Sequence, residues 1–146
     1  DKTVSLLYID LDSFKAINDT YGHTVGDAVL MHTADVLSAS FREDFVARLG
    51  GDEFLVVHLG DCPICRLEQE ADTFLKEIRK EFLAAGQSIM LSASVGIAQA
   101  SDAGLDIDLL LQRSDQALYR AKNGGKNRYC VQGKELCGDK GKEPVI

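Results

Sequence analysis

A short apolar segment that ends at two carboxylates constrains the fold of this chain most strongly. Residues 4–9 are apolar apart from Ser5, and Asp10 and Asp12 follow them. Such a run predicts a buried β-strand. In a regular strand, residues two positions apart share a face, so both carboxylates are expected to point the same way. The sequence therefore predicts paired acids at the end of the first strand.

A second acidic cluster lies in a predicted β-hairpin. Strands over 45–49 and 54–59 flank a pair of glycines at 50–51, which Asp52 and Glu53 follow. Glycine adopts the positive φ that tight hairpin turns need. If the hairpin lies beside the first strand, four carboxylates converge at one edge of the sheet. Such a cluster needs a cation, and oxygen ligands with little nearby His or Cys favour Mg²⁺, which also takes phosphate oxygens.

The rest of the chain alternates predicted helices and strands. This alternation predicts an α+β fold, a sandwich in which helices flank a mixed sheet. The further predicted elements are a turn over 13–18, a helix with Leu30 and Phe41 on one face, a helix that starts near Pro63, buries Phe82 and ends at Gly86, a strand over 89–98 in which Gly96 marks a bulge or a close backbone approach, a helix from Ile107 to Gly124, and a strand over 127–131.

Length and charge narrow the function. The 146 residues suit one domain, which we place at 1–131, with 132–146 as a loose Gly- and Lys-rich tail. A net charge of -7 disfavours a general nucleic-acid-binding surface. No apolar run approaches the roughly 18 residues that span a membrane. We expect a cytoplasmic domain without a membrane segment or nucleic-acid partner.

The cysteines give a weak signal. Cys62 and Cys65 have the spacing of a metal or redox pair, but no second pair completes a zinc site. We expect all four cysteines of the chain to be reduced thiols, and a redox or metal role for this pair stays open.

Taken singly, other candidate residues have ordinary explanations. Asp27 lies in the first turn of a predicted helix, where a carboxylate interacts favourably with the helix dipole. Lys122 and Lys126 flank a predicted helix end, where cations are equally favourable. The same lysines suit phosphate binding.

Together, four ordered motifs closely resemble the GGDEF family of diguanylate cyclases. The resemblance runs from about residue 4 to 131 and implies a fold similar to the palm of nucleotidyl cyclases and polymerases. The motifs are residues 8–27, Arg48-Leu49-Gly50-Gly51-Asp52-Glu53-Phe54, residues 92–98 and residues 115–122.

The resemblance implies a metal site built from carboxylates. Asp10 and Asp52 would bind Mg²⁺, or Mn²⁺, together with the backbone carbonyl of Leu11. Asp52 would also help to activate the 3′-hydroxyl of GTP, and Glu53 would support the metal site.

It also implies a GTP site. Lys15 would stabilise charge on the reacting phosphates, and backbone amides around Phe14 and Lys15 would hold phosphate oxygens. The remaining implied contacts are Asn18 and Asp27 with the guanine edge, His23 with the wall of that pocket, and Lys122 and Lys126 with the terminal phosphates.

The implied activity is the condensation of two GTP molecules into cyclic di-GMP and two pyrophosphates. Each domain would hold one GTP, so the resemblance implies an antiparallel homodimer, with a fused sensor or regulatory domain outside this chain. The alternative is a catalytically silent GGDEF domain that binds GTP and regulates a partner domain.

Two features depart from the family pattern. An inhibitory product site, Arg-x-x-Asp, would place its Asp at Asp44, but Phe41 holds the Arg position and Arg42 is one residue away. We therefore expect a degenerate inhibitory site. The family's helical lead-in before the first strand also has no counterpart in this sequence.

Overall fold

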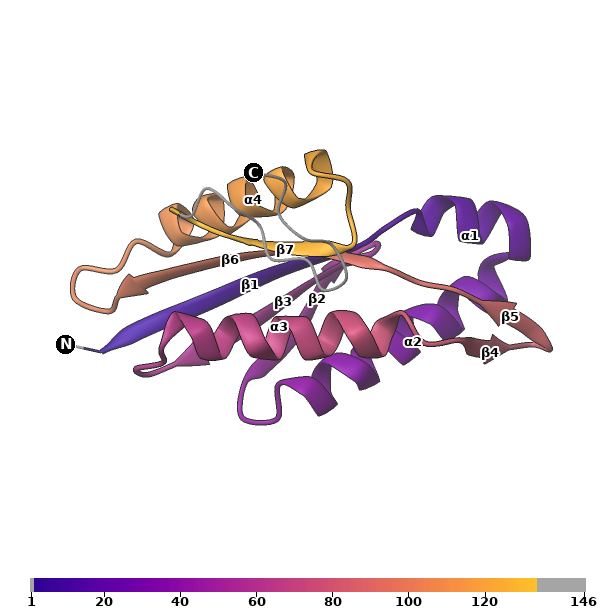
Figure 1. Ribbon diagram of the computed structural model, residues 1–146, viewed down its shortest axis with the longest axis horizontal. Helices are drawn as coiled ribbons and strands as arrows, with labels where there is room; N and C mark the ends of the chain where they lie inside the picture. Colours follow the sequence, from indigo (N-terminus) through magenta and orange to yellow (C-terminus); the bar gives the residue numbers. More distant parts are fainter. Residues whose placement is uncertain (1, 134–146) are drawn as a thin grey trace.

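The computed structural model describes residues 2–133 and has a mixed sheet flanked by helices (Figure 1). The strands of the five-stranded sheet are ordered β2-β3-β1-β6-β7, and only β6 and β7 run parallel. This confirms the predicted α+β class. The elements are β1 (Thr3–Leu11), α1 (Phe14–Tyr21), α2 (His23–Ser40), β2 (Phe45–Gly50), β3 (Glu53–Leu59), α3 (Ile64–Ile78), β4 (Phe82–Ala84), β5 (Gln87–Ile89), β6 (Ala93–Ser101), α4 (Ile107–Asn123) and β7 (Arg128–Val131).

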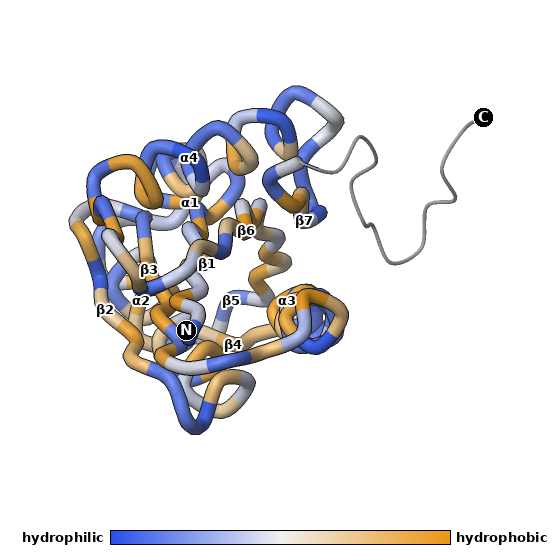
Figure 2. Tube along the Cα trace, turned by 90° about the vertical axis from the view of Figure 1, so that its left-hand side faces the viewer, coloured by the Kyte–Doolittle hydropathy of each residue, from blue (hydrophilic) through white to orange (hydrophobic). Residues whose placement is uncertain are grey.

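Helices cover both faces of the central strand β1, which explains its nearly continuous apolar sequence. Leu7 and Ile9 join the larger core cluster on the side of α2 and α3. Val4 and Leu6 join a second cluster with Leu110 of α4. Figures 1 and 2 show α4 on one side of the sheet and α3 on the other. Because side chains alternate, the even-numbered positions of β1 face α4.

The predicted hairpin is confirmed. β2 and β3 are antiparallel neighbours, with Val46 opposite Val56. Gly50 and Gly51 have φ values of 150° and 51°, the region that side chains disfavour. The hairpin also lies beside β1, as the convergence of the two acidic clusters requires.

The predicted turn over 13–18 is wrong, because helix α1 occupies this segment from Phe14 onward. Ser13 adopts a left-handed conformation with φ 59°, which reverses the chain directly after β1. The polar residues around Asn18 suggested a loop. The helical signal was the spacing of Phe14 and Ile17, of which Ile17 is buried.

The predicted long second helix is also wrong in its C-terminal part. α3 ends at Ile78, and Phe82 belongs to the short strand β4. Gly86 lies in the β4–β5 turn, where Ala85 and Gly86 have φ values of 51° and 77°. Phe82 follows Ile78 by four residues and so continued the helical pattern, but its ring stacks on His32 at a centroid distance of 4.0 Å.

The strand predicted over 89–98 is divided between two sheets. Ile89 ends β5, and the main-sheet strand β6 begins at Ala93. The residues between them belong to neither strand. Apolar spacing continued across this break and concealed it.

The cysteines differ in part from the prediction. Cys62 and Cys65 are free thiols, whereas Cys130 is disulfide-bonded. The expectation of four reduced cysteines is therefore wrong for Cys130, and the sequence spacing did not indicate this bond.

The expected loose tail lies, from 134 onward, outside the described residues. Within residues 2–133, none of the helices combines the length and apolarity needed to traverse a lipid bilayer.

Gly96 allows α4 to approach the sheet closely, as its position in the sequence suggested. A β-carbon at Gly96 would collide with the Ser114 carbonyl and with the backbone of Leu118. Only glycine therefore permits this distance between β6 and α4. The packing sets the distance between α4 and the sheet at Ser114 and Leu118.

We expect Gly96→Ala to lower the free energy of unfolding by about 3 kcal/mol, because the added methyl meets backbone that cannot rotate away. Ser101→Ala, in the same strand but exposed, is the control and should change it by about 0.5 kcal/mol or less. Urea denaturation measures both. Equal effects of the two substitutions would contradict the packing argument.

Candidate functional site

The hairpin turn is fastened to the end of β1. In the ladder between β1 and β3, Asp10 lies opposite Glu53. Beyond it, the Leu11 N–H donates to the carbonyl oxygen of Asp52 at 3.2 Å. The two acidic segments, about forty residues apart in sequence, therefore meet at one sheet edge.

The turn after β1 adds a helix N-terminus to this edge. Ser13 reverses the chain, and α1 begins at Phe14. The first N–H groups of a helix have no partner within the helix and carry the positive end of its dipole. The amides of Phe14 and Lys15 are such groups, and they suit a phosphate or another anion.

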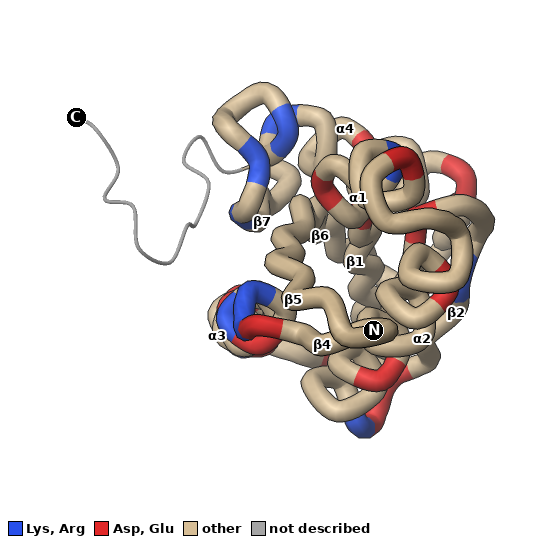
Figure 3. The backbone as a smooth tube through the Cα atoms, turned by 90° about the vertical axis from the view of Figure 1, so that its right-hand side faces the viewer, with Lys and Arg blue, Asp and Glu red and all other residues tan. Residues whose placement is uncertain are grey.

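The end of α4 supplies two cations. Lys122 lies in the last turn of α4, and Lys126 lies in the turn that leads to β7. Figure 3 shows Lys and Arg segments at this junction. The Lys122 ammonium donates to Asp10 Oδ2. Burial lowers the pKa of Lys122, and the neighbouring charge of Lys126 lowers it further.

These three segments enclose one cavity of about 200 Å³. It contains every predicted metal or phosphate residue except Glu53. Lysine side chains and helix amides make one part of it attractive to anions, while carboxylates attract cations. The cavity is lined by Asp10, Leu11, Asp12, Ser13, Phe14, Lys15, Asp52, Lys122 and Lys126.

Asp10 has an open coordination position. The residue is 5% exposed, and Lys122 binds Oδ2, whereas buried Oδ1 has no hydrogen-bond partner among the described residues. An unpaired buried carboxylate oxygen is costly. A hard cation at Oδ1 would satisfy it, and Asp52 and backbone oxygen complete a donor set suited to Mg²⁺.

The two acidic segments meet at the sheet edge as predicted, but their four carboxylates do not form one metal-binding cluster. Within residues 2–133, no three His, Cys, Asp or Glu side chains are grouped closely enough to hold a metal by themselves. Asp12 lies beyond the last residue of β1 and accepts hydrogen bonds from Ser92 and Ser94 instead. Any metal at Asp10 therefore needs backbone, water or ligand oxygens as well.

Glu53 faces a neighbouring cavity of about 430 Å³ that also contains Asp115, Tyr119 and Lys122. The Tyr8 hydroxyl lies within electrostatic reach of the Glu53 carboxylate. Burial raises the pKa of Tyr8, and the Glu53 charge adds to the rise. Sequence reasoning missed Tyr8; its signal was its even-numbered place on the α4 face of β1.

The candidate guanine contacts lie outside the smaller cavity, where α1 meets α2. A β-carbon at Gly26 would collide with the Asn18 side chain, so Asn18 packs directly on the α2 backbone. His23 begins α2, and Asp27 lies one turn later with an exposed side chain. The structure thus brings Asn18 next to the turn of α2 that carries Asp27.

Comparison with known proteins decides the family. The family described as "Diguanylate cyclase, GGDEF domain" matches residues 1–128. The chain belongs to the GGDEF domain family. Relatives of this GGDEF domain include the bifunctional diguanylate cyclase/cyclic di-GMP phosphodiesterase MucR of Pseudomonas aeruginosa, 37% identical over 131 residues. Another is the cyclic di-GMP phosphodiesterase PdeR of Escherichia coli, 38% identical over 129 residues.

The GGDEF domain is much shorter than these relatives. The matched regions cover 89% and 88% of this chain but only 19% of MucR and of PdeR. Among solved structures, the GGDEF domain of DgcB from Caulobacter crescentus, in complex with c-di-GMP, is similar with a TM-score of 0.84 at 28% identity. That match covers 91% of this chain and 80% of the other.

The two positions of the degenerate inhibitory site, Phe41 and Asp44, are both engaged inside this GGDEF domain. Phe41 is 1% exposed and joins the main hydrophobic core at the end of α2. The Asp44 side chain is 3% exposed, and its Oδ1 lies 2.5 Å from His58 Nδ1. The aromatic ring and the carboxylate therefore both have partners inside the domain.

Proposed function

We propose that this GGDEF domain is a diguanylate cyclase that condenses two GTP molecules into cyclic di-GMP and two pyrophosphates. The observation that carries the proposal is the arrangement around Asp10. Asp10, whose buried Oδ1 has no hydrogen-bond partner among the described residues, lines the same cavity as Asp52, the start of α1 and three lysines. The proposed cation and phosphate sites would thus be adjacent, as nucleotidyl transfer requires.

Asp10 Oδ1, Asp52 and the Leu11 carbonyl would hold Mg²⁺ or Mn²⁺. The bound ion lowers the pKa of a hydroxyl and neutralises charge on phosphate oxygens. Because Lys122 uses Oδ2 of Asp10, the opposite oxygen stays available to the ion. Glu53 would support the site from the neighbouring cavity.

The triphosphate would lie along the lysines. Amides of Phe14 and Lys15 hold phosphate oxygens, and the Lys15 ammonium stabilises charge at the reacting phosphorus. Lys122 and Lys126 hold the terminal phosphates, which leave as pyrophosphate. Asp52 helps to activate the 3′-hydroxyl.

Guanine recognition would use the junction of α1 and α2. Asn18 and Asp27 bond the guanine edge, while His23 shapes the pocket. Asp27 accepts from N1–H and from the amino group, donors that adenine does not offer there. A site built on such bonds rejects a base that leaves them unmade.

The proposed reaction needs two copies of the domain in antiparallel orientation. The 3′-oxygen of each GTP forms a bond to the α-phosphorus of the other, and the bond to pyrophosphate breaks. We further propose that a fused sensor or regulatory domain controls this pairing and that the domain acts in the cytoplasm.

A silent, GTP-binding regulatory domain is the second candidate. The similarity to PdeR, which is named for phosphodiesterase activity alone, favours it. The complete set of acids and lysines around the cavity favours the cyclase. GTP binding without product would distinguish the regulatory domain from the enzyme.

Incubation with GTP and Mg²⁺, followed by chromatography, tests the proposal. Cyclic di-GMP should form, and the rate per domain should rise with protein concentration because two domains must meet. Asp52→Asn should lower the rate by about a thousandfold or more, since it removes a metal ligand. Asp102→Asn changes an exposed carboxylate directly after β6, away from the cavity; it is the matched control and should remain active.

No product at any protein concentration, or an active Asp52→Asn variant, would refute the assignment. Circular dichroism of both variants keeps loss of folding distinct from loss of catalysis.

We also propose that product inhibition through Asp44 is absent. Asp44→Ala should leave initial rates in the presence of cyclic di-GMP unchanged. It should lower the free energy of unfolding by about 2 kcal/mol, because His58 loses its partner. Glu43→Ala, exposed next to Asp44, should change neither. Phe41→Arg is unsuitable because it would bury a guanidinium in the core.

Titration of initial rates with cyclic di-GMP measures the effect. Tight inhibition of the unmodified protein that disappears in Asp44→Ala would show that this site functions without an arginine at position 41.

A further inference from the structure

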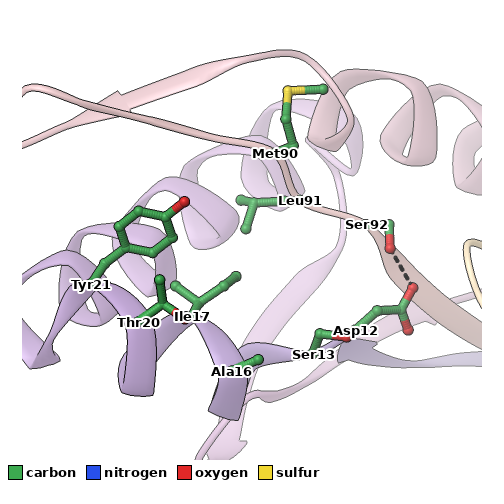
Figure 4. A pocket seen from close by; sticks show the side chains of 9 residues that line it. All are labelled: Asp12, Ser13, Ala16, Ile17, Thr20, Tyr21, Met90, Leu91 and Ser92. Atoms are coloured by element: carbon green, nitrogen blue, oxygen red, sulfur yellow. Dashed lines mark hydrogen bonds between the residues drawn. The ribbon is translucent and has the colours of Figure 1, made fainter.

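Asp12 is the acid of the first cluster that the proposed chemistry does not use. Both of its carboxylate oxygens are occupied: Oδ1 accepts from Ser94 Oγ at 2.8 Å, and Oδ2 accepts from Ser92 Oγ at 2.6 Å. Oδ2 also accepts from the backbone N–H of Asn127 at 3.0 Å. Figure 4 shows Asp12 turned toward Ser92, the residue directly before β6. The carboxylate therefore joins the end of β1 to two distant segments.

One of these segments carries Lys126 into the phosphate cavity. Lys126 and Asn127 have φ values of 63° and 52°, and two consecutive left-handed residues other than glycine are unfavourable. At its start the turn is held by the bond from the Lys126 N–H to the Ala121 carbonyl. At its end it is held by Asp12 through Asn127.

We propose that Asp12 is a positioning residue that fixes Lys126 for phosphate binding, an inference that rests on the proposed function for the role of Lys126. Asp12 is 8% exposed and fully hydrogen-bonded, so its carboxylate acts through the turn and not as a metal ligand. Without it, the strained turn relaxes and the ammonium of Lys126 leaves the cavity. Asp12 thus links the strand that carries Asp10 to a lysine on the opposite wall.

Amide hydrogen exchange of the full chain tests the link without nucleotide. Asp12→Ala should raise the exchange rate of the Asn127 amide. This increase should be at least about tenfold larger than the increase at slowly exchanging amides of the β1–β6 ladder. Ser94→Ala, which removes only the bond to Oδ1, is the matched control and should keep Asn127 protected. If the exchange rate at Asn127 rises only as much as the rates in the β1–β6 ladder, or does not rise, the proposal is overturned.

A double-mutant cycle tests the consequence for binding. The probe is a GTP analogue with a methylene bridge between the α- and β-phosphates, measured by calorimetry with Mg²⁺. When Lys126 is present, Asp12→Ala should weaken binding of the analogue about tenfold. In the Lys126→Ala background, the same substitution should weaken it less than about twofold. Equal weakening in both backgrounds would mean a merely structural role and would overturn the proposal.

Two further arms complete the test. If Asp12→Ala does not fold, Asp12→Ser replaces it, because a serine hydroxyl is too short to bond Ser94 and Asn127 together. Asp12→Asn keeps an oxygen for the Asn127 N–H and should retain most of the binding; full loss there would count against the link. If the unmodified protein binds no analogue, the proposed function fails, and hydrogen exchange alone decides the role of Asp12.

Discussion

The backbone hydrogen bond from Leu11 to Asp52 is the contact on which the rest of the site depends. It continues the β1–β3 ladder by one step, past the pair of Asp10 and Glu53, and folds the hairpin turn onto the end of β1. Two glycines with positive φ make that turn possible. Neither acidic segment has a metal site alone. The pairing of two antiparallel strands brings together the residues of the proposed one.

Alternation along β1 determines which groups meet at this edge. Even-numbered positions face α4, so Asp10 points to the helix that carries Lys122. Gly96 sets how closely that helix lies on the sheet. The length of α4 then places its last turn, and the turn beyond it, beside the carboxylates. A core packing contact thus helps to determine the position of the lysines that we propose bind phosphate.

The sequence predicted those parts of the fold that follow from local chemistry. The first strand, the hairpin and the close approach at Gly96 could all be recognised from apolar spacing and glycine placement. The β4–β5 hairpin was missed because Phe82 falls in helical register with Ile78. α1 was missed because its start depends on the left-handed conformation of Ser13.

For the site, residue types and motifs identified which groups line the cavity but not how each side chain is used. Asp12 looked equivalent to Asp10 until its hydrogen bonds were known. The difference comes from Ser94 and the Asn127 amide, which lie more than eighty residues away in sequence. Tyr8 was missed for a similar reason, because it comes near Glu53 only through the β1–β3 pairing. Such assignments depend on tertiary contacts.

The distinction between Asp10 and Asp12 at the end of β1 is the central claim. Mn²⁺ binding, measured by electron paramagnetic resonance in the presence of the methylene-bridged GTP analogue, tests it most directly. Asp10→Asn should weaken Mn²⁺ binding by about a hundredfold, because the only unpaired carboxylate oxygen of the pair is lost. Asp12→Asn should change it little. Near-normal Mn²⁺ binding by Asp10→Asn, with loss in Asp12→Asn, would show that the metal lies at Asp12 and would contradict this account.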